Sequence, residues 1–112
     1  MQLVTAVVKP HMLDEVKDAL KAKGVTGITV SEVKGFGRQG GHTETYRGTE
    51  YQIDFVPKTR IDILTSDAQA EAVAAVITET ARTGKIGDGK VWVLGVESVS
   101  RIRTGERDQD AL

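Results

Sequence analysis

The segment Gly84-Lys-Ile-Gly-Asp-Gly-Lys90 combines three glycines and two lysines in seven residues. Backbone amides of such a segment can wrap an anion, and ammonium groups add opposite charge. The spacing fits G-x-x-x-x-G-K, but Val91 stands where a phosphate-binding P-loop needs Ser or Thr. The predicted order is also helix, then segment, then strand, so no helix N-terminus would face a phosphate. The segment is not a P-loop, and both an anion-binding turn and a plain solvated turn stay open.

Two arginines follow the strand that this segment opens. Arg101 and Arg103 are one residue apart, so in an extended chain both side chains point to the same side. Guanidinium groups donate paired hydrogen bonds to phosphate oxygens. A lone pair of arginines would mean little, but together with the glycine segment it indicates a polyphosphate ligand.

A second glycine-rich segment, residues 35–50, shows neither a helical nor a strand period. Loops longer than ~12 residues without internal structure are uncommon in compact domains and are usually functional. Its start fits G-x-G-x-x-G, but no helical pattern follows, so a dinucleotide site is not indicated. A flexible hinge, or a backbone anion site beside Arg38 and Gln39, fits better. Tyr46 and Tyr51 are either anchors of this loop or docking or modification sites.

Composition excludes several classes of function. Lys+Arg 15 against Asp+Glu 16 gives no reason to expect nucleic acid. The absence of cysteine excludes thiolate zinc sites, and two histidines form no cluster at metal spacing. No Ser/His/Asp or Cys/His spacing indicates catalysis, so we expect no enzyme. The longest apolar run, residues 72–77, is far below the ~18 residues of a membrane span, and no signal segment is visible, so we expect a cytoplasmic protein.

The elements that must position these residues follow from apolar spacing. Alternating or branched apolar residues predict four strands, the third bent near Pro57, at residues 3–8, 28–33, 53–63 and 91–99. Helical spacing predicts a helix from about Leu13 that Gly24 stops. A second helix would begin at Ser66 and Gln69, which resemble a capping box, and end before Gly84. Residues 101–112 form a polar tail without period.

The order of the elements predicts an α+β fold of ferredoxin-like βαββαβ type, a single domain over residues 1–112. Both helices would cover one face of a four-stranded antiparallel sheet, and a long flexible loop would join strands 2 and 3. The last strand is apolar on both faces, with Val91 and Val93 on one and Trp92, Leu94 and Val96 on the other. Because that pattern is expected where both faces are buried, another copy of the chain would cover the bare face.

Several strings spread over the chain are specific in combination: Val8-Lys9-Pro10, Gly35-Phe-Gly-Arg-Gln, Gly41-His-Thr-Glu, Tyr46-Arg-Gly-Thr-Glu-Tyr51, Asp54-Phe-Val-Pro-Lys58, Thr83-Gly-Lys-Ile-Gly-Asp-Gly-Lys-Val-Trp92 and Arg101-Ile-Arg-Thr-Gly-Glu-Arg107. Together they resemble the PII family of nitrogen regulatory signal-transduction proteins over essentially the whole chain. The last string looks most like bacterial members, those of actinobacterial type among them.

The resemblance implies a homotrimer that senses ATP or ADP at subunit clefts, together with 2-oxoglutarate. It would regulate nitrogen assimilation or ammonium uptake through an effector loop at about 37–55. The implied partners are an ammonium transporter of the Amt family, nitrogen-metabolism enzymes and regulators, and a nucleotidylyltransferase that uridylylates or adenylylates Tyr51. No nucleic acid is implied, and a membrane is reached only through a transporter.

Carried over by position, the resemblance also implies ligand contacts. Those to nucleotide are Gly35, Gly37, Arg38, Gln39, Lys58, Gly87, Asp88, Gly89 and Lys90, with Arg101 and Arg103 reaching the phosphates from the neighbouring subunit. The adenine and ribose would be lined by Val7, Thr29, Asp62, Leu64 and Ile86. The contacts to 2-oxoglutarate would be Lys9, Gln39, Lys58 and Gly87. Lys58 would pair with its distal carboxylate, and Gln39 would bridge it to Mg²⁺ on the ATP phosphates.

The chain departs from the family pattern at a few positions. Gly40 stands where the family has Lys, Lys9 where it often has Arg, Asp62 where Glu is usual, and Thr49 where Ala or Ser is expected. Other classes on the same architecture fit less well. An acylphosphatase-like hydrolase needs an Asn that this chain lacks, and an RNA-binding module needs aromatic residues on its central strands. A cation-tolerance trimer would lack the glycine segments.

Overall fold

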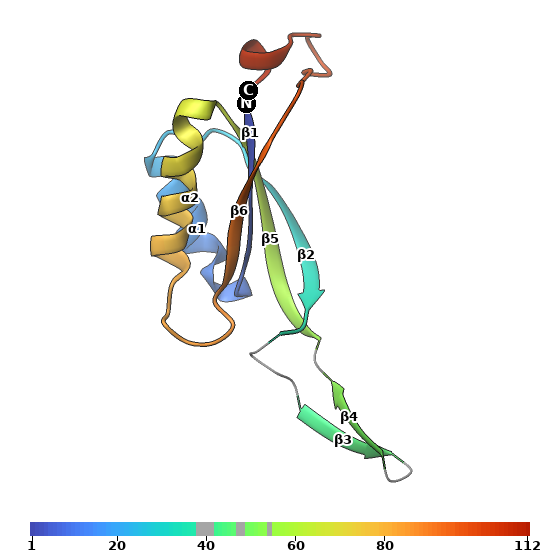
Figure 1. Ribbon diagram of the computed structural model, residues 1–112. Coiled ribbons are helices and arrows are strands. Elements are labelled where there is room, and N and C mark those ends of the chain that lie inside the picture. The colour runs from blue at the N-terminus through green and yellow to red at the C-terminus, as the bar shows by residue number, and fades with distance from the viewer. Residues whose placement is uncertain (38–41, 47–48, 54) are drawn as a thin grey trace.

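The computed structural model describes residues 1–37, 42–46, 49–53 and 55–112, with the backbone alone for 42–46 and 49–53. Four strands form one antiparallel sheet in the order β2-β5-β1-β6 (Figure 1). Their bounds are Gln2–Val8 for β1, Thr29–Gly35 for β2, Val56–Thr65 for β5 and Gly89–Gly95 for β6. This arrangement confirms the predicted ferredoxin-like α+β fold, while the domain extent of 1–112 stays a prediction.

Two helices cover one face of this sheet. Helix α1, Leu13–Ala22, follows the short 3-10 helix η1, Pro10–Met12, and α2 spans Asp67–Ala81. Alternate residues of the central strands point toward them, because side chains in a strand alternate between faces. The resulting core consists of Val4, Ala6, Val8, Met12, Val16, Leu20, Ile61, Ile63, Ala70, Val73, Ile77 and Ala81.

The helix ends follow the predicted signals in part. Gly24 adopts φ +90 directly after α1, the left-handed conformation that ends many helices. Ser66 is the N-cap of α2 as predicted, but its side chain makes no capping hydrogen bond. Instead its carbonyl accepts from the Gln69 amide at 3.2 Å. The prediction of a capping box between Ser66 and Gln69 was therefore wrong. The charge favoured at a helix start comes from Asp67, which binds the N-terminal ammonium of Met1 at 2.7 Å.

Strand β6 ends earlier than predicted, at Gly95 rather than Val99. Its partner explains this difference, since Gly95 pairs with Gln2, the first residue of β1. Beyond that point the strand has no neighbour to continue the ladder. The Val96 amide still donates to the Met1 carbonyl at 3.1 Å.

The segment predicted as a loop without structure contains a β-hairpin. Strand β3, His42–Tyr46, pairs antiparallel with β4, Thr49–Ile53, and extends away from the main sheet (Figure 1). Its threonines, tyrosines and isoleucine favour a pleated backbone although no apolar period marks a core face. The expectation that residues 53–63 form one strand was also wrong. Ile53 belongs to β4 and pairs with His42, whereas β5 begins at Val56.

The C-terminal segment is more ordered than a tail without period. Ser100 and Arg107 form a β-bridge, and the Arg101 amide donates to the Glu106 carbonyl at 2.8 Å. A 3-10 helix η2, Asp108–Ala111, follows. Hydrogen bonds between residues close in sequence stabilise this segment. The pattern of apolar residues therefore could not reveal it.

The second face of the sheet carries apolar side chains that no helix covers. Trp92 is 37% exposed, Leu64 46% and Leu94 55%, and Leu94 pairs with Leu3 of the neighbouring strand β1. The helix side of β6 is not fully closed either, since Val93 is 41% exposed. In a single chain the last strand is therefore accessible on both faces.

Candidate functional site

A hollow of about 690 Å³ lies at one end of the sheet. Here β1 ends where β6 begins, with Val7 opposite Lys90, and β2 ends where β5 begins, with Gly35 opposite Val56. The register thus brings residues from four strands and from the segment before β6 to one place. The lining residues are Val7, Gly35, Phe36, Gly37, Lys58, Ile86, Gly87, Gly89, Lys90 and Trp92.

Residues 83–89, hereafter the glycine loop, connect α2 to β6 and form one side of the hollow. Gly89 has φ +98, and a Cβ built there would lie 1.7 Å from the carbonyl oxygen of Val7. No side chain fits at this distance, so glycine permits the loop to enter β6 directly against β1. Gly87, at φ +99, turns the loop just before that point.

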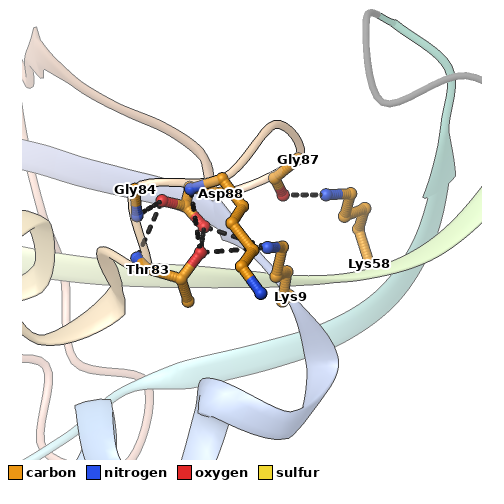
Figure 2. Close-up of polar contacts among 7 residues, drawn as sticks. Lys9, Lys58, Thr83, Gly84, Gly87 and Asp88 are labelled. Carbon is orange, nitrogen blue, oxygen red and sulfur yellow. Dashed lines mark hydrogen bonds and ion pairs between the residues drawn. The ribbon is translucent and has the colours of Figure 1, made fainter.

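The carboxylate of Asp88 holds both ends of the glycine loop together (Figure 2). It accepts hydrogen bonds from the amides of Thr83 at 2.8 Å and Gly84 at 2.9 Å, and from the Thr83 hydroxyl. The Lys9 ammonium lies 3.1 Å from the same carboxylate. The hydrogen bond from the Thr83 side chain, followed by those from backbone amides and Lys9, holds the pKa of Asp88 far below its usual range. The Lys85 amide donates to the Thr83 hydroxyl at 3.2 Å. The first three loop amides are thus used within the loop, and a bound anion would meet the later ones.

Lys58 projects from β5 toward the glycine loop and is 7% exposed. Its ammonium donates to the carbonyl of Gly87 (Figure 2). Burial lowers the pKa of Lys58, and the charge of Lys9 lowers it further, while Asp88 acts in the opposite direction. A largely buried cation whose carbonyl partner carries no formal charge is a strong candidate to bind an anion.

A second hollow of about 770 Å³ lies toward the other end of the sheet. Thr29 and Leu64 line it, together with Arg101 from the C-terminal segment. The Arg101 guanidinium donates to the Leu112 carbonyl at 3.2 Å and lies 3.4 Å from Glu106. Arg103 is exposed. The structure therefore divides the predicted nucleotide contacts between the two ends of the sheet.

Asp62 lines the second hollow and is engaged with its neighbours. Its carboxylate accepts from the Thr5 hydroxyl at 2.7 Å and from two nitrogens of Arg60 at 3.0 and 3.3 Å. Burial alone would raise the pKa of Asp62, but the hydrogen bonds from Arg60 and Thr5 outweigh it and lower that pKa. The carboxylate is consequently fixed and ionised on the uncovered face of the sheet.

Comparison with known proteins identifies the family. The family model described as "Nitrogen regulatory protein P-II" matches residues 1–106. The chain belongs to the P-II family. It is 54% identical to the nitrogen regulatory protein P-II of Pasteurella multocida, 55% to that of Rhizobium meliloti and 52% to the nitrogen regulatory protein GlnK of Escherichia coli K12, each over 112 residues and the full length of both chains. The predicted family is confirmed, and its relatives are named as regulatory proteins.

Several of the predicted P-II contacts meet in the first hollow: Val7, Gly35, Gly37, Lys58, Ile86, Gly87, Gly89 and Lys90. Arg38, Gln39 and Gly40 lie outside the described residues. Tyr51 belongs to β4, where its backbone pairs with Glu44, but its side chain is outside the description. The ligand roles of all these residues stay predictions.

Sequence reasoning missed three side chains at this P-II site. Phe36 lines the hollow and packs edge-on against Phe55, with ring centroids 5.5 Å apart, and both rings are more than 60% exposed. Thr83 was not singled out, because its bond to Asp88 across a glycine loop has no characteristic spacing. Trp92 was assigned only to the sheet face. Its place in the hollow follows from pairing with Thr5, which the sequence does not reveal.

The described part of this P-II chain holds neither a cluster of metal ligands nor a membrane-spanning helix. Residues 1–37 and 55–112 contain no group of three or more His, Asp or Glu side chains that could hold a metal ion. In the same part, no helix has the length and apolar character needed to cross a membrane.

Proposed function

We propose that this P-II chain senses ATP or ADP together with 2-oxoglutarate at clefts between the subunits of a homotrimer. It is a regulator rather than an enzyme, acts in the cytoplasm, and passes its state to nitrogen-assimilation partners through the effector loop at about 37–55. The observation that carries this proposal is the hollow beside the glycine loop, which combines two lysines, Lys58 and Lys90, with glycine backbone.

Anionic ligands fit this hollow on chemical grounds. Lys90 follows the glycine loop directly and lines the hollow, so its ammonium can pair with phosphate. Loop amides beyond Lys85 can donate to the same oxygens, as backbone amides do in other anion sites. These features support a polyphosphate such as that of ATP or ADP.

The effector 2-oxoglutarate would meet the buried ammonium of Lys58. A carboxylate there would add the charged partner that the Gly87 carbonyl does not supply. Gln39 and the ATP phosphates would hold Mg²⁺ next to it. Because 2-oxoglutarate would bind against the Mg²⁺ that the ATP phosphates hold, each ligand would stabilise the other, and reciprocal linkage makes the two gains in affinity equal.

The homotrimer is supported by the uncovered sheet face and by the divided contacts. Arg101 follows the far end of β6 from Lys90, so the two cannot line one cleft within this fold (Figure 1). A neighbouring copy would bring Arg101 and Arg103 to the phosphates. It would also bury the apolar side chains of the open face.

The proposed partners are an Amt-type ammonium transporter or enzymes and regulators of nitrogen metabolism. A nucleotidylyltransferase would modify Tyr51, in the effector loop. A β-hairpin that extends from the main sheet can enter a partner while the trimer body stays intact.

Calorimetry tests the proposed function directly. ATP should bind the wild-type chain, and 2-oxoglutarate should bind tightly only with Mg²⁺ and ATP present, each ligand tightening the other by roughly 5- to 150-fold. ADP should not support the effector. Absence of ATP binding, or an effector that binds independently of ATP, would contradict the proposal.

A further inference from the structure

We infer that Lys9 is a positioning residue of the glycine loop rather than a ligand of 2-oxoglutarate. It acts with Thr83 and Asp88, and these three residues are called the loop clasp. The inference rests on the proposed function for its ligand, but the contacts that carry it lie within the chain. Its consequence is that Lys9 controls nucleotide affinity through the shape of the loop.

The clasp closes the glycine loop on itself. One carboxylate oxygen of Asp88 accepts from the amides of Thr83 and Gly84, at 2.8 and 2.9 Å. The first two loop residues are thereby fixed to the last but one. A turn rich in glycine has many accessible backbone conformations, so such a closure selects one of them.

Lys9 completes the clasp from a different element. Its ammonium lies 3.1 Å from the Asp88 carboxylate and donates to the Thr83 hydroxyl, also at 3.1 Å. That hydroxyl donates in turn to Asp88, so the three groups form a closed, directed network. Lys9 comes directly after β1 and before Pro10, which ties the loop to a rigid corner of the fold.

The burial of the pair separates it from an ordinary surface ion pair. The side chains of Lys9 and Asp88 are 21% and 23% exposed, so both charges are shielded from most of the solvent. Exposed pairs contribute little, but a shielded carboxylate left without its cation is costly. An effector that drew the Lys9 ammonium away from Asp88 would leave that carboxylate without its cation. Lys58, which already faces the hollow, needs no such exchange.

The clasp sets the position of the nucleotide contacts because they are adjacent in the chain. Gly87 and Gly89 flank Asp88, and Lys90 follows. Lys58 holds the carbonyl of Gly87 from one side while the clasp holds Asp88 from the other (Figure 2). When the clasp opens, the loop keeps one of its two attachments and its amides lose their common orientation.

Amide hydrogen exchange in the ligand-free chain gives the first test. Lys9→Met and Asp88→Asn should both accelerate exchange at Thr83 and Gly84, whereas Lys9→Arg, which keeps the charge, should restore wild-type protection. Asp14→Asn is the matched control, since it removes an exposed ion pair with Lys17 at 3.8 Å and should leave the loop unchanged. Unchanged exchange in Lys9→Met would overturn the inference, whether or not ATP binds.

Ligand affinities give the second test. Lys9→Met and Asp88→Asn should each weaken ATP about tenfold, the low end of the effect of removing groups that support ligand-binding residues. The double variant should be no weaker than the worse single variant, and 2-oxoglutarate at saturating ATP should bind as to wild type. If Lys9→Met lost only 2-oxoglutarate affinity, Lys9 would be a direct effector ligand and the inference wrong.

Failure of the proposed function and failure of the loop clasp give different results. Failure of the wild-type chain to bind ATP would contradict the proposed function alone, because the exchange experiment still decides on the clasp. If Asp88→Asn fails to fold, Thr83→Val removes the central hydroxyl without changing charge. It should show the same accelerated exchange, and wild-type exchange in that variant would overturn the inference.

Discussion

Two lysines at the end of one sheet have different partners and therefore different expected roles. Lys58 is buried and donates to a carbonyl, and among residues 1–37 and 55–112 its charge has no direct ionic contact. Lys9 is paired with Asp88. The resemblance implied that both contact the effector, because a sequence shows the type and position of a residue but not which neighbouring group it contacts. At this scale the partner of a side chain decides its function.

Lys58→Met should abolish 2-oxoglutarate binding while ATP still binds without the effector. The substitution keeps a long side chain in the buried position and removes the ammonium that the effector carboxylate needs. Titration calorimetry with each ligand measures both effects. Equal weakening of both ligands would assign Lys58 to the structure of the hollow instead.

The lowered pKa of Lys58 predicts a pH dependence of effector binding. Its ammonium is lost at a lower pH than that of an ordinary lysine, so 2-oxoglutarate affinity should decline on the alkaline side before exposed lysines titrate. Stability should change in the opposite direction. Between the lowered pKa and the ordinary pKa of lysine, the unfolded chain holds a proton at this group that the folded chain has lost. The free energy of unfolding therefore rises as pH rises through the lowered pKa. In Lys58→Met both trends should be absent, and a wild-type affinity that stays flat until ordinary lysines titrate would count against the assignment.

Asp88 predicts a second pH effect on stability, in the acid range. Its pKa is lowered on folding, so its contribution to stability is complete above the usual carboxyl range and declines as pH falls toward the lowered value. Wild type should unfold at a higher temperature than Asp88→Asn at neutral pH, and the difference should narrow in acid. Thermal melts across that range measure it, and a gap that widens in acid would refute the assignment.

At the scale of elements, strand register is what assembles the hollow. The pairing of β1 with β6 brings the glycine loop against Val7, and the pairing of β2 with β5 brings Lys58 beneath it. The loop can enter β6 there only because Gly89 has no side chain. A loop and a strand junction, rather than a helix terminus, therefore form the end of the sheet that we propose binds anions.

Gly89→Ala should displace the glycine loop and weaken ATP. The added Cβ would meet the Val7 carbonyl oxygen in a left-handed backbone conformation, a strain of at least about 1 kcal/mol. Gly95→Ala, at the opposite end of the same strand, meets nothing within 4 Å and should change stability by less than about 0.5 kcal/mol. Urea unfolding and ATP titration of the two variants test this contrast, and equal behaviour would contradict it.

Particular elements show how far sequence could lead. Helix α1 and its end at Gly24, the order of strands and helices along the chain and the glycine loop were predictable, because apolar period and glycine position determine them locally. The hairpin β3–β4, His42–Tyr46 and Thr49–Ile53, was not, since its residues show no apolar period in the sequence. The end of β6 depended on where β1 begins, and the loop clasp on side-chain contacts across a turn. Both are properties of the folded chain rather than of any local pattern.

At the scale of the whole molecule, a single chain leaves its sheet half covered. The apolar side chains of Leu64 and Leu94 lie on the face opposite the helices, each about half exposed. Burying such surface contributes about 25 cal/mol per Å² of apolar area, so association with other copies is favourable. Assembly and ligand binding then become linked, because the proposed clefts need two copies.

Leu94→Asp should prevent assembly and, with it, tight ATP binding. A carboxylate on the open face would have to be desolvated between subunits, which costs far more than the lost apolar contact. Light scattering should give the mass of one chain rather than three. Glu71→Lys, on the exposed side of α2, is the control and should remain assembled. A trimeric Leu94→Asp would show that this face is not the interface.

Trp92 gives the protein a natural optical reporter. It is the single tryptophan of the sequence, it lies on the open face, and it lines the hollow beside Lys90. Its emission should shift to the blue when neighbouring copies exclude water from the indole, and ligand in the hollow should change its intensity. Dilution and titration can thus be followed separately in one unlabelled sample, by wavelength for assembly and by intensity for occupancy, because no second indole contributes to the signal.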